Sequence, residues 1–400
     1  MSAATVHLTS RDTEWDAARQ LGLTVGEEIL DGGSAARVFR ATGADGADVA
    51  LKVLTADAGL VDGHDLDSFL GKLRQLNWIR AGDETLAARC LPVLHAVRGP
   101  GWAAYTTPFY ESVDSAASLR LALGCGAFFD LQTKLVKDLI VYGYGQASAP
   151  AGPGFLTSAL VDRIPRRWRV LREALPAEVL DADPLVVNGV PCANPRRLLA
   201  ELTAGPPPWW NRLAPPRLMF PAHGDANTRN VLVGADGFRL IDPRGSTAWW
   251  DPVYDLAKTL FSLTVWDPAL RLGTHTRRDG DGGWLVGFRR PAYPGYAAAA
   301  CQFLDRLQAM PALAALLGDD RHWADRLLWT HALHTLAEAP CRLSDRKTRH
   351  DPAGLPITPE ELALCHYLLG ALLLHDLVTA EGELNAETHL ALVAGALPPP

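Results

Sequence analysis

Cysteine is scarce in this chain, with six thiols among 400 residues and no two of them close together in the sequence. A domain stapled by disulfides needs denser cysteine, and a zinc site needs ligands at short spacings, so both are excluded. We interpret the thiols as small buried hydrophobic groups in a reducing cytosol. They are Cys90, Cys125, Cys192, Cys301, Cys341 and Cys365.

Long apolar runs are also missing. The longest one in the C-terminal part, residues 367–374, is bounded by His366 and His375 and is too short to span a bilayer. Charged residues between positions 11 and 16 interrupt the N-terminal segment before any apolar stretch, so no signal peptide is predicted. We therefore expect a cytoplasmic protein without a membrane partner.

An excess of basic charge is absent as well, since 38 lysine and arginine residues face 45 aspartate and glutamate residues, a net charge of −7. An acidic chain is no general nucleic-acid binder, although a local basic cleft is compatible with it. The hydrophobic share of 48% excludes disorder. The length suits one large domain or two modest ones, and the oligomeric state is left open.

Short strands separated by glycine turns dominate the first hundred residues. Such strands pair antiparallel, because a parallel pair needs a long crossover connection. One helix is predicted at residues 65–80, where apolar side chains recur at helical spacing and Asp65 and Asp67 lie in the first turn. The strands are expected at residues 23–30, 37–40, 49–54, 91–97 and 102–107.

After Pro108 the pattern becomes mainly helical. A strand-and-loop segment at 218–241 interrupts it, and the arginine- and proline-rich section at about 143–216 is interpreted as an insertion. We therefore predict an α+β protein with an N-lobe at 1–107, a small antiparallel sheet with one helix, and a larger helical C-lobe at 108–400. Its helices are expected at residues 119–142, 254–263, 293–307, 323–336 and 360–378.

The most informative stretch runs from His223 to Asp242. Asp225 and Asn230 are five residues apart, and a tight loop can turn both side chains toward one point. A hairpin at 231–241, with Asp-Gly at its turn, returns Asp242 to the mouth of that loop. Two carboxylates and an amide oxygen suit Mg²⁺, and one carboxylate can orient a hydroxyl nucleophile. The alternative is a polar loop in which Asp225 caps and Asp242 forms a turn.

A glycine loop and a lysine precede this stretch. Gly32, Gly33 and Ser34 lie between two predicted strands, where small residues let backbone N–H groups approach phosphate oxygens. Lys52 is the only charge within an apolar strand, a position from which a lysine contacts the α- and β-phosphates of a nucleotide. The alternative places Lys52 on an exposed strand edge.

These motifs together resemble the aminoglycoside phosphotransferase and choline kinase family, which has the protein-kinase-like fold. The resemblance extends from Gly32 to about Lys258 and is carried by His-Gly-Asp, the following Asn230, and Ile-Asp-Pro-Arg-Gly around Asp242. It implies that Asp225 is the catalytic aspartate and that Asn230 and Asp242 bind the metal ion. It also implies ATP or GTP and Mg²⁺ as cofactors.

The resemblance suggests roles for further residues. Backbone groups near Thr107 and Phe109 would meet the adenine edge at the hinge between the lobes, unless this segment is an ordinary connection. Asp255 would brace the catalytic loop. Arg244 would face phosphate or an anionic acceptor, or else neutralise the carboxylates. His223 is interpreted as an orienting core histidine.

One expected residue is missing. A kinase-like lysine usually pairs with a glutamate on the next helix, but no glutamate occurs between Glu28 and Glu84. Asp67 or Asp65 could replace it, or both could simply be acids at a helix start. The partner of Lys52 therefore stays open.

Other groups allow two interpretations each. His331 and His334 could be metal ligands, the arginines at 163–169 could bind an anion, and the tryptophan pairs at 209–210 and 249–250 could line an acceptor pocket. For the histidines we favour core or cleft-wall positions, for the arginines an exposed helix face, and for the tryptophans ordinary packing.

Together these features predict a small-molecule kinase. It would transfer the γ-phosphoryl group of ATP or GTP to a hydroxyl of a sugar, amino sugar, antibiotic or related metabolite. The alternative is a catalytically inactive nucleotide-binding regulator, which the missing glutamate favours. A metal-dependent hydrolase using His223, Asp225 and Asp242 would need neither the glycine loop nor Lys52. No activation segment follows Asp242, so protein substrates are not expected.

Overall fold

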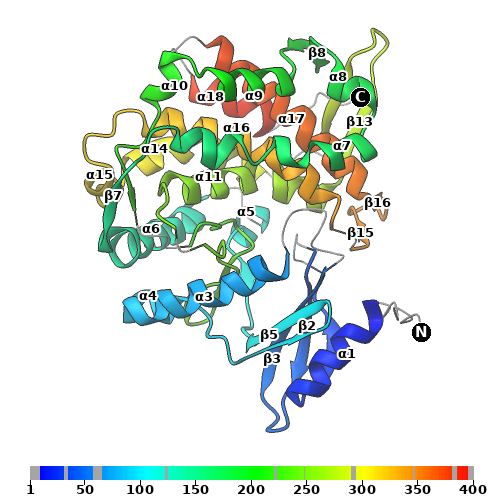
Figure 1. Cartoon of the computed structure of the whole chain (residues 1–400), viewed down its shortest axis with the longest axis vertical. Coiled ribbons are helices and arrows are strands. Elements are labelled where there is room, and N and C mark those ends of the chain that lie inside the picture. The colour runs from blue at the N-terminus through cyan, green and yellow to red at the C-terminus, as the bar shows by residue number, and fades with distance from the viewer. Residues whose placement is uncertain are drawn as a thin grey trace, which may run out of the picture.

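A five-stranded antiparallel sheet forms the centre of the N-terminal lobe, with strand order β1-β2-β3-β5-β4 (Figure 1). The computed structural model describes residues 10–30, 35–56, 65–121, 125–219, 223–246, 248–289, 294–345, 347–380 and 385–394. The elements of this lobe are α1 (Ser10–Leu21), β1 (Thr24–Glu28), β2 (Arg37–Thr42), β3 (Asp48–Thr55), α3 (Leu66–Gly82), α4 (Glu84–Arg89), β4 (His95–Gly99) and β5 (Trp102–Pro108). The antiparallel sheet expected from the sequence is confirmed.

Each face of this sheet is covered by a helix, because side chains alternate between the faces along a strand. Phe39, Leu51 and Val53 pack with α1 on one face. Leu54 and Tyr105 pack with α3 on the other face. The prediction of one helix in this lobe was therefore wrong, since α1 and α4 accompany α3.

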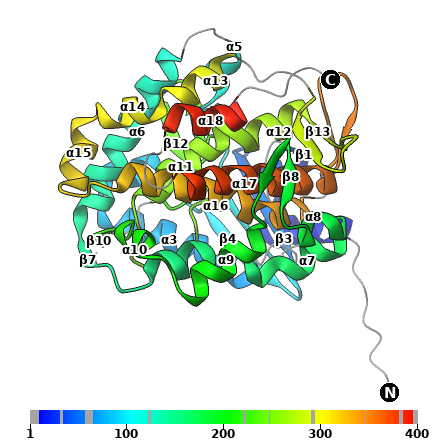
Figure 2. The ribbon, with the colours of Figure 1, turned by 90° about the horizontal axis from the view of Figure 1, so that it is seen from above.

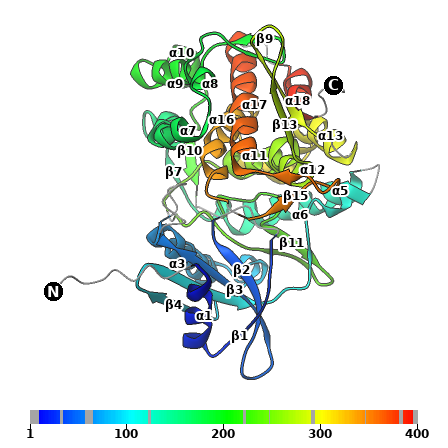
Figure 3. The same cartoon turned by 90° about the vertical axis from the view of Figure 1, so that its right-hand side faces the viewer.

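The helix α3 begins where the sequence predicts and lies at the boundary between the lobes (Figure 3). Asp65 is its N-cap and accepts a hydrogen bond from the backbone N–H of Ser68 at 2.7 Å. Leu76 and Ile79, near its C-terminal end, belong to a hydrophobic cluster with Val231 of the following lobe. This packing fixes α3 against the segment that carries the predicted catalytic residues.

Three helices form the centre of the C-terminal lobe: α11 (Val253–Phe261), α16 (Trp323–Arg342) and α17 (Pro359–Thr379). They lie side by side (Figure 2). By length and composition α17 could cross a membrane, but 78% of its most apolar window is buried within the protein. Packing in this core accounts for its apolar composition. A capping box of Thr358 and Glu361 begins α17.

Shorter elements surround this centre. The predicted helices at 119–142 and 293–307 are each broken in two, as α5 and α6 and as α13 and α14. The first part of the lobe contains β6 (Val113–Asp114), α5 (Ala117–Leu121), α6 (Gly126–Tyr142), β7 (Ser148–Pro150), α7 (Trp168–Ala174), α8 (Ala177–Asp181), β8 (Leu185–Val187), β9 (Val190–Cys192), α9 (Pro195–Ala204), α10 (Pro208–Arg212), β10 (Arg217–Met219), β11 (Val231–Gly234) and β12 (Gly237–Leu240). Later elements are α12 (Asp267–Leu272), β13 (Thr274–Arg278), β14 (Trp284–Phe288), α13 (Pro294–Cys301), α14 (Phe303–Gln308), α15 (Pro311–Leu317), β15 (Arg349–His350), β16 (Pro356–Ile357) and α18 (Ala386–Ala394).

The expected hairpin after Asn230 is confirmed. Strands β11 and β12 pair antiparallel from Val231 with Leu240 to Gly234 with Gly237. Because the two strands run side by side, the residues that precede β11 and follow β12 meet at one end of the hairpin. The six thiols are free, and Cys301 is the exposed one among them.

Candidate active site

The loop at residues 223–230 is held in place by α11. Asp255, in the first turn of that helix, accepts the backbone N–H groups of Gly224 and Ala226, each at 2.9 Å, and the hydroxyl of Tyr144 also donates to it. Asp255 is 2% exposed. Its bracing role, expected from the sequence, follows from these bonds, because a buried carboxylate that accepts two backbone N–H groups of one loop fixes the loop backbone.

His223 joins this loop to the end of β12. The side chain is fully buried. Its Nε2 atom donates to the carbonyl of Ile241 at 2.9 Å, while Nδ1 accepts the backbone N–H of Asp225 at 3.2 Å. Both ring nitrogens are therefore engaged with backbone, and His223 orients the loop as expected.

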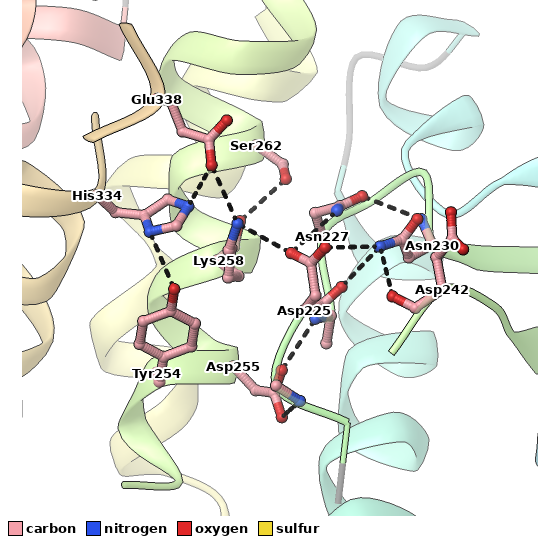
Figure 4. Close-up of polar contacts among 12 residues, drawn as sticks. Asp225, Asn227, Asn230, Asp242, Tyr254, Asp255, Lys258, Ser262, His334 and Glu338 are labelled. Atoms are coloured by element: carbon pink, nitrogen blue, oxygen red, sulfur yellow. Dashed lines mark hydrogen bonds and ion pairs between the residues drawn. The ribbon is translucent and has the colours of Figure 1, made fainter. Parts of the chain in front are cut away.

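Asp225 and Asn230 lie together (Figure 4). The Nδ2 group of Asn230 is 3.2 Å from Oδ2 of Asp225, 2.9 Å from its carbonyl oxygen and 3.4 Å from the carbonyl oxygen of Asp242. Asn227 donates to the other carboxylate oxygen of Asp225 at 3.3 Å. Since the amide of Asn230 donates through nitrogen, its carbonyl oxygen is the atom left for a ligand.

Asp242 follows β12 and has a left-handed backbone, with φ of 55°. Such conformations are costly for a residue other than glycine and cluster at functional sites. Its carboxylate forms an ion pair with Lys52, accepts the hydroxyl of Tyr105 at 3.0 Å, and lies 3.6 Å from the ammonium of Lys72. Burial would raise the pKa of Asp242, but the charges of Lys52 and Lys72 outweigh burial and hold it below the usual range.

Lys52 is buried at the centre of the sheet, which rules out the alternative of an exposed strand edge. It lies on β3, between β2 and β5, and is 7% exposed. Burial lowers the pKa of Lys52 to about 8 against the opposing charge of Asp242, and the nearby charge of Lys72 contributes to the lowering.

Neither of the two acids suggested as partners of Lys52 forms an ion pair with it, and the alternative, that both lie at a helix start, is confirmed. Asp67 is largely exposed and pairs with Arg98 at 3.3 Å, and Asp65 caps α3. Both are therefore acids at the start of a helix, where the dipole favours them. Lys52 pairs instead with Asp242 of the other lobe.

The face of α3 that meets the site carries Lys72 and Gln75, which the sequence interpretation missed. Gln75 is fully buried and donates to the carbonyl of His223 at 3.1 Å, while its oxygen accepts the N–H of Gly245 at 2.7 Å and of Ser246 at 3.1 Å. Three positions apart on a helix, Lys72 and Gln75 share a face. That spacing was the sequence signal that could have placed both residues on one face. The residue of this face that reaches Asp242 is the cation Lys72, whereas the sequence analysis looked for an acid on α3 as the partner of Lys52.

Lys258 and Glu338 form a second missed pair behind Asp225 (Figure 4). The ammonium of Lys258 is 2.9 Å from Oδ1 of Asp225 and 3.4 Å from Glu338, which also contacts His334 at 3.2 Å and Arg342 at 2.8 Å. Burial opposes both charges, yet the charges of Asp225 and Glu338 raise the pKa of Lys258, and the charge of Lys258 helps to lower that of Glu338. Lys258 therefore holds Asp225 from the side opposite Asn230.

Arg244 lies against aromatic rings. Its guanidinium carbon is 3.7 Å from the ring centre of Trp250 and 4.7 Å from that of Tyr254. Across the described residues it forms no ion pair with a carboxylate, so no direct contact supports the alternative in which it neutralises the carboxylates. A Cβ atom on Gly224 would lie 2.8 Å from that of Arg244, which places the arginine directly beside the loop at residues 223–230.

Of the residues predicted to bind nucleotide, Gly32, Gly33 and Ser34 lie outside the described residues. Thr107 is on β5 beside Ala50. The backbone N–H of Phe109 donates to the carbonyl of Asp48 at 3.1 Å. That group is therefore engaged within the sheet, and it does not serve as a free donor to adenine.

Three of the remaining candidates, His331, His334 and Trp210, are packed in the interior of the protein. His331 and His334 are buried in α16, and no group of three or more His, Cys, Asp or Glu side chains suited to a metal occurs in the described part of the chain. Trp210 is buried against Trp329, with ring centres 5.3 Å apart. Within the arginine cluster Arg163 contacts the site region, donating to the hydroxyl of Tyr254 at 2.7 Å.

No protein-family model matches the sequence, and no curated protein matches it. Among solved structures, the chain aligns with an aminoglycoside-3'-phosphotransferase of type VIII at 18% identity and a TM-score of 0.39, covering 79% of this chain and 98% of that one. A choline kinase from Cryptosporidium parvum Iowa II aligns at 12% identity and a TM-score of 0.45, covering 96% and 100%. Amicoumacin kinase in complex with AMP-PNP, Ca²⁺ and Ami aligns at 12% identity and a TM-score of 0.40, covering 89% and 97%.

The fold is protein-kinase-like, as the sequence predicts. This follows from the arrangement itself: a five-stranded antiparallel sheet carries Lys52 on its central strand, and the lysine contacts Asp242 at the end of a hairpin in a helical lobe.

Proposed function

We propose that this protein is a small-molecule kinase that transfers the γ-phosphoryl group of ATP or GTP to a hydroxyl group. The observation that carries the proposal is the meeting of Lys52, Asp225, Asn230 and Asp242 in one network across the two lobes. A phosphoryl transfer needs a cation for the phosphates, oxygen ligands for a metal ion and an oxygen to orient the nucleophile. These side chains supply all three.

Asp225 is the residue proposed to orient the acceptor. Its side chain is 25% exposed, and Asn227, Asn230 and Lys258 hold its two oxygens in place. The acceptor oxygen would form a bond to the γ-phosphorus as the bond from that phosphorus to the β,γ-bridging oxygen breaks. The hydroxyl proton would pass to Asp225, and the nucleoside diphosphate would leave. Catalysis of this kind is mainly positioning and electrostatics.

The residues present fit a magnesium ion. The amide oxygen of Asn230 and the carboxylate of Asp242 are hard oxygen donors, and two protein ligands suffice for an ion that takes its other ligands from phosphates and water. When bound, Mg²⁺ would neutralise and orient the phosphates. Lys52, now paired with Asp242, is the cation proposed for the α- and β-phosphates.

A second candidate is a nucleotide-binding regulator without turnover. It is favoured by one observation, namely that α3 directs Lys72 and not an acid toward Lys52 and Asp242. The braced positions of Asp225 and Asn230 favour the enzyme, since a protein that only binds nucleotide has no need of an oriented acceptor carboxylate. We further propose a cytoplasmic protein that acts on a free small molecule, with neither nucleic acid nor membrane as partner.

Nucleotide consumption in the presence of a panel of hydroxylated metabolites tests the proposal. We expect ATP or GTP turnover that depends on Mg²⁺ and on an acceptor, and we expect Asp225→Asn to lower it at least 10²-fold while AMP-PNP still binds. Asp236→Asn is the matched control, because Asp236 lies at the exposed turn of the neighbouring hairpin. Nucleotide binding without turnover under any condition would favour the regulator, and equal activity of Asp225→Asn would contradict the assigned role.

A further inference from the structure

Positive charge surrounds Asp225 on the side away from the N-terminal lobe. Lys258 contacts Asp225 directly, and Arg342 reaches the same Glu338 that Lys258 contacts. Arg163 is joined to this group through His334, with its NH2 atom 2.8 Å from Nδ1 of that ring. Lys258, Arg342 and Arg163 are three cations in this network against two acids, Asp225 and Glu338. The nearby carboxylate of Asp255 is occupied by two backbone N–H groups and the hydroxyl of Tyr144.

Arg244 adds a further positive charge, next to the loop that carries Asp225. Its side chain lies against Gly224, the residue before Asp225, and its guanidinium stacks on Trp250 and Tyr254. Stacking uses the face of a guanidinium and leaves the N–H groups in its plane available, in a fork that matches a carboxylate or phosphate. No described carboxylate occupies that fork.

The pKa of Tyr254 is shifted by the same positive charges. Burial would raise its pKa, but the charges of Arg163, Arg244 and Lys258 outweigh burial and lower it. The Nε atom of Arg163 is buried and has no hydrogen-bond partner among the residues that the structure describes. A cationic acceptor placed between Tyr254 and Asp225 would meet these like charges, whereas an anionic acceptor would be attracted by them.

We propose that the acceptor carries an oxyanion, a carboxylate or a phosphate, close to the hydroxyl that is phosphorylated, and that Arg244 binds this oxyanion. The inference rests on the proposed kinase function and narrows it to one substrate class. It separates this protein from kinases of cationic aminoglycosides or choline-like alcohols, which the sequence resemblance leaves open. Arg244 then determines acceptor specificity, while Asp225 orients the hydroxyl beside it.

Matched acceptors that share a carbon skeleton test the charge preference. Glucose, glucosamine, gluconate and glucose 6-phosphate form one set, and glycerol, glycerate and glycerol 3-phosphate form another. Product formation with ATP and Mg²⁺ is followed by mass spectrometry, and the carboxylate and phosphate members show which oxyanion is preferred. We expect turnover of anionic members, at least tenfold above their neutral or cationic counterparts in kcat/KM. A preference for neutral or cationic members would overturn the proposal.

Variants of Arg244 then test the residue. Because a charge-assisted hydrogen bond contributes about 1.5–3 kcal/mol, Arg244→Gln should raise KM for the anionic acceptor by about 10- to 150-fold, with kcat changed much less. Arg244→Lys, which keeps the charge but loses the fork, should recover part of the effect. Arg166→Gln is the control, since Arg166 is an exposed arginine of the section at 143–216 that also contains Arg163. An unchanged KM in Arg244→Gln would overturn the assignment.

If no acceptor in either set is phosphorylated, binding separates the two proposals. Inorganic phosphate and acetate are titrated calorimetrically into the full-length protein with the nucleotide site saturated by AMP-PNP and Mg²⁺, and in the absence of nucleotide if AMP-PNP does not bind. Binding that weakens at least tenfold in Arg244→Gln but not in Arg166→Gln supports the anion site even where the kinase function fails. Absent binding, or equal binding in the two variants, rejects the anion site.

Discussion

Lys258 contacts two acids, Asp225 and Glu338, and its removal should lower the free energy of unfolding because both carboxylates lose a cation. Breaking a buried ion pair by deleting one partner costs about 3–5 kcal/mol, because a charge stays behind without compensation. Asp225 is 25% exposed and Glu338, 15% exposed, keeps His334 and Arg342. We therefore expect Lys258→Met to lower the free energy of unfolding by a value at the lower end, about 3 kcal/mol.

A double-mutant cycle isolates the pair. Urea unfolding at neutral pH is measured for the wild type, Lys258→Met, Glu338→Gln and the double variant. The double variant should lose about 1–2 kcal/mol less than the sum of the single variants, because the second substitution removes a charge that the first one left uncompensated. The exposed pair of Arg278 and Glu178 provides the control cycle, with an expected coupling below about 1 kcal/mol. Additive losses at Lys258 and Glu338 would refute the reasoning.

Three further predictions concern separate parts of the molecule. Asp255→Ala should lower the free energy of unfolding by about 3–6 kcal/mol in urea denaturation, because three buried donors lose their acceptor, and a loss below about 1 kcal/mol would contradict the bracing role. Lys72→Met removes a second cation beside Asp242, where the phosphates are proposed to bind, and should weaken AMP-PNP binding about 5- to 10-fold by calorimetry while the exposed control Lys134→Met leaves it unchanged. Burial lowers the pKa of His366 to about 3, so only the unfolded state takes up this proton as the pH falls from about 6.5 toward 3. His366→Leu should therefore lose about 2 kcal/mol less stability than the wild type between pH 7 and pH 5, and equal losses in the two proteins would contradict this sign.

The loop at residues 223–230 and its hairpin could be predicted because they are determined by neighbouring residues of the sequence. Asp225 and Asn230 are five residues apart, and a short hairpin with Asp-Gly at its turn leads to Asp242. A tight turn of that kind determines where the chain returns. Lys52 was predictable for a similar reason, since one charge inside an apolar strand needs an explanation.

The supporting residues could not be predicted, because their roles depend on helix packing. Lys258 and Glu338 are 80 positions apart, and each looks like an ordinary polar residue within a helical pattern. The pattern of apolar residues gives the face of a helix but not its neighbour. The same limit applies to Lys72, whose charge gains its meaning only from Asp242 of the other lobe.

The α1 helix was missed for a different reason. Its apolar face is short, with Ala17 and Ala18 as the buried residues that meet the sheet, and charged residues make up much of the rest of the helix. The prediction of a lone helix in the N-terminal lobe therefore failed where small side chains do the packing.

The most direct test is an experimental structure of the protein with AMP-PNP and Mn²⁺, in which the anomalous signal locates the metal. We expect a peak at coordination distance from the carboxylate of Asp242 and the amide oxygen of Asn230, with Lys52 turned to the α- and β-phosphates and Asp225 facing the γ-phosphate. A metal bound away from Asn230 and Asp242, or phosphates that do not approach Lys52 and Asp225, would contradict it.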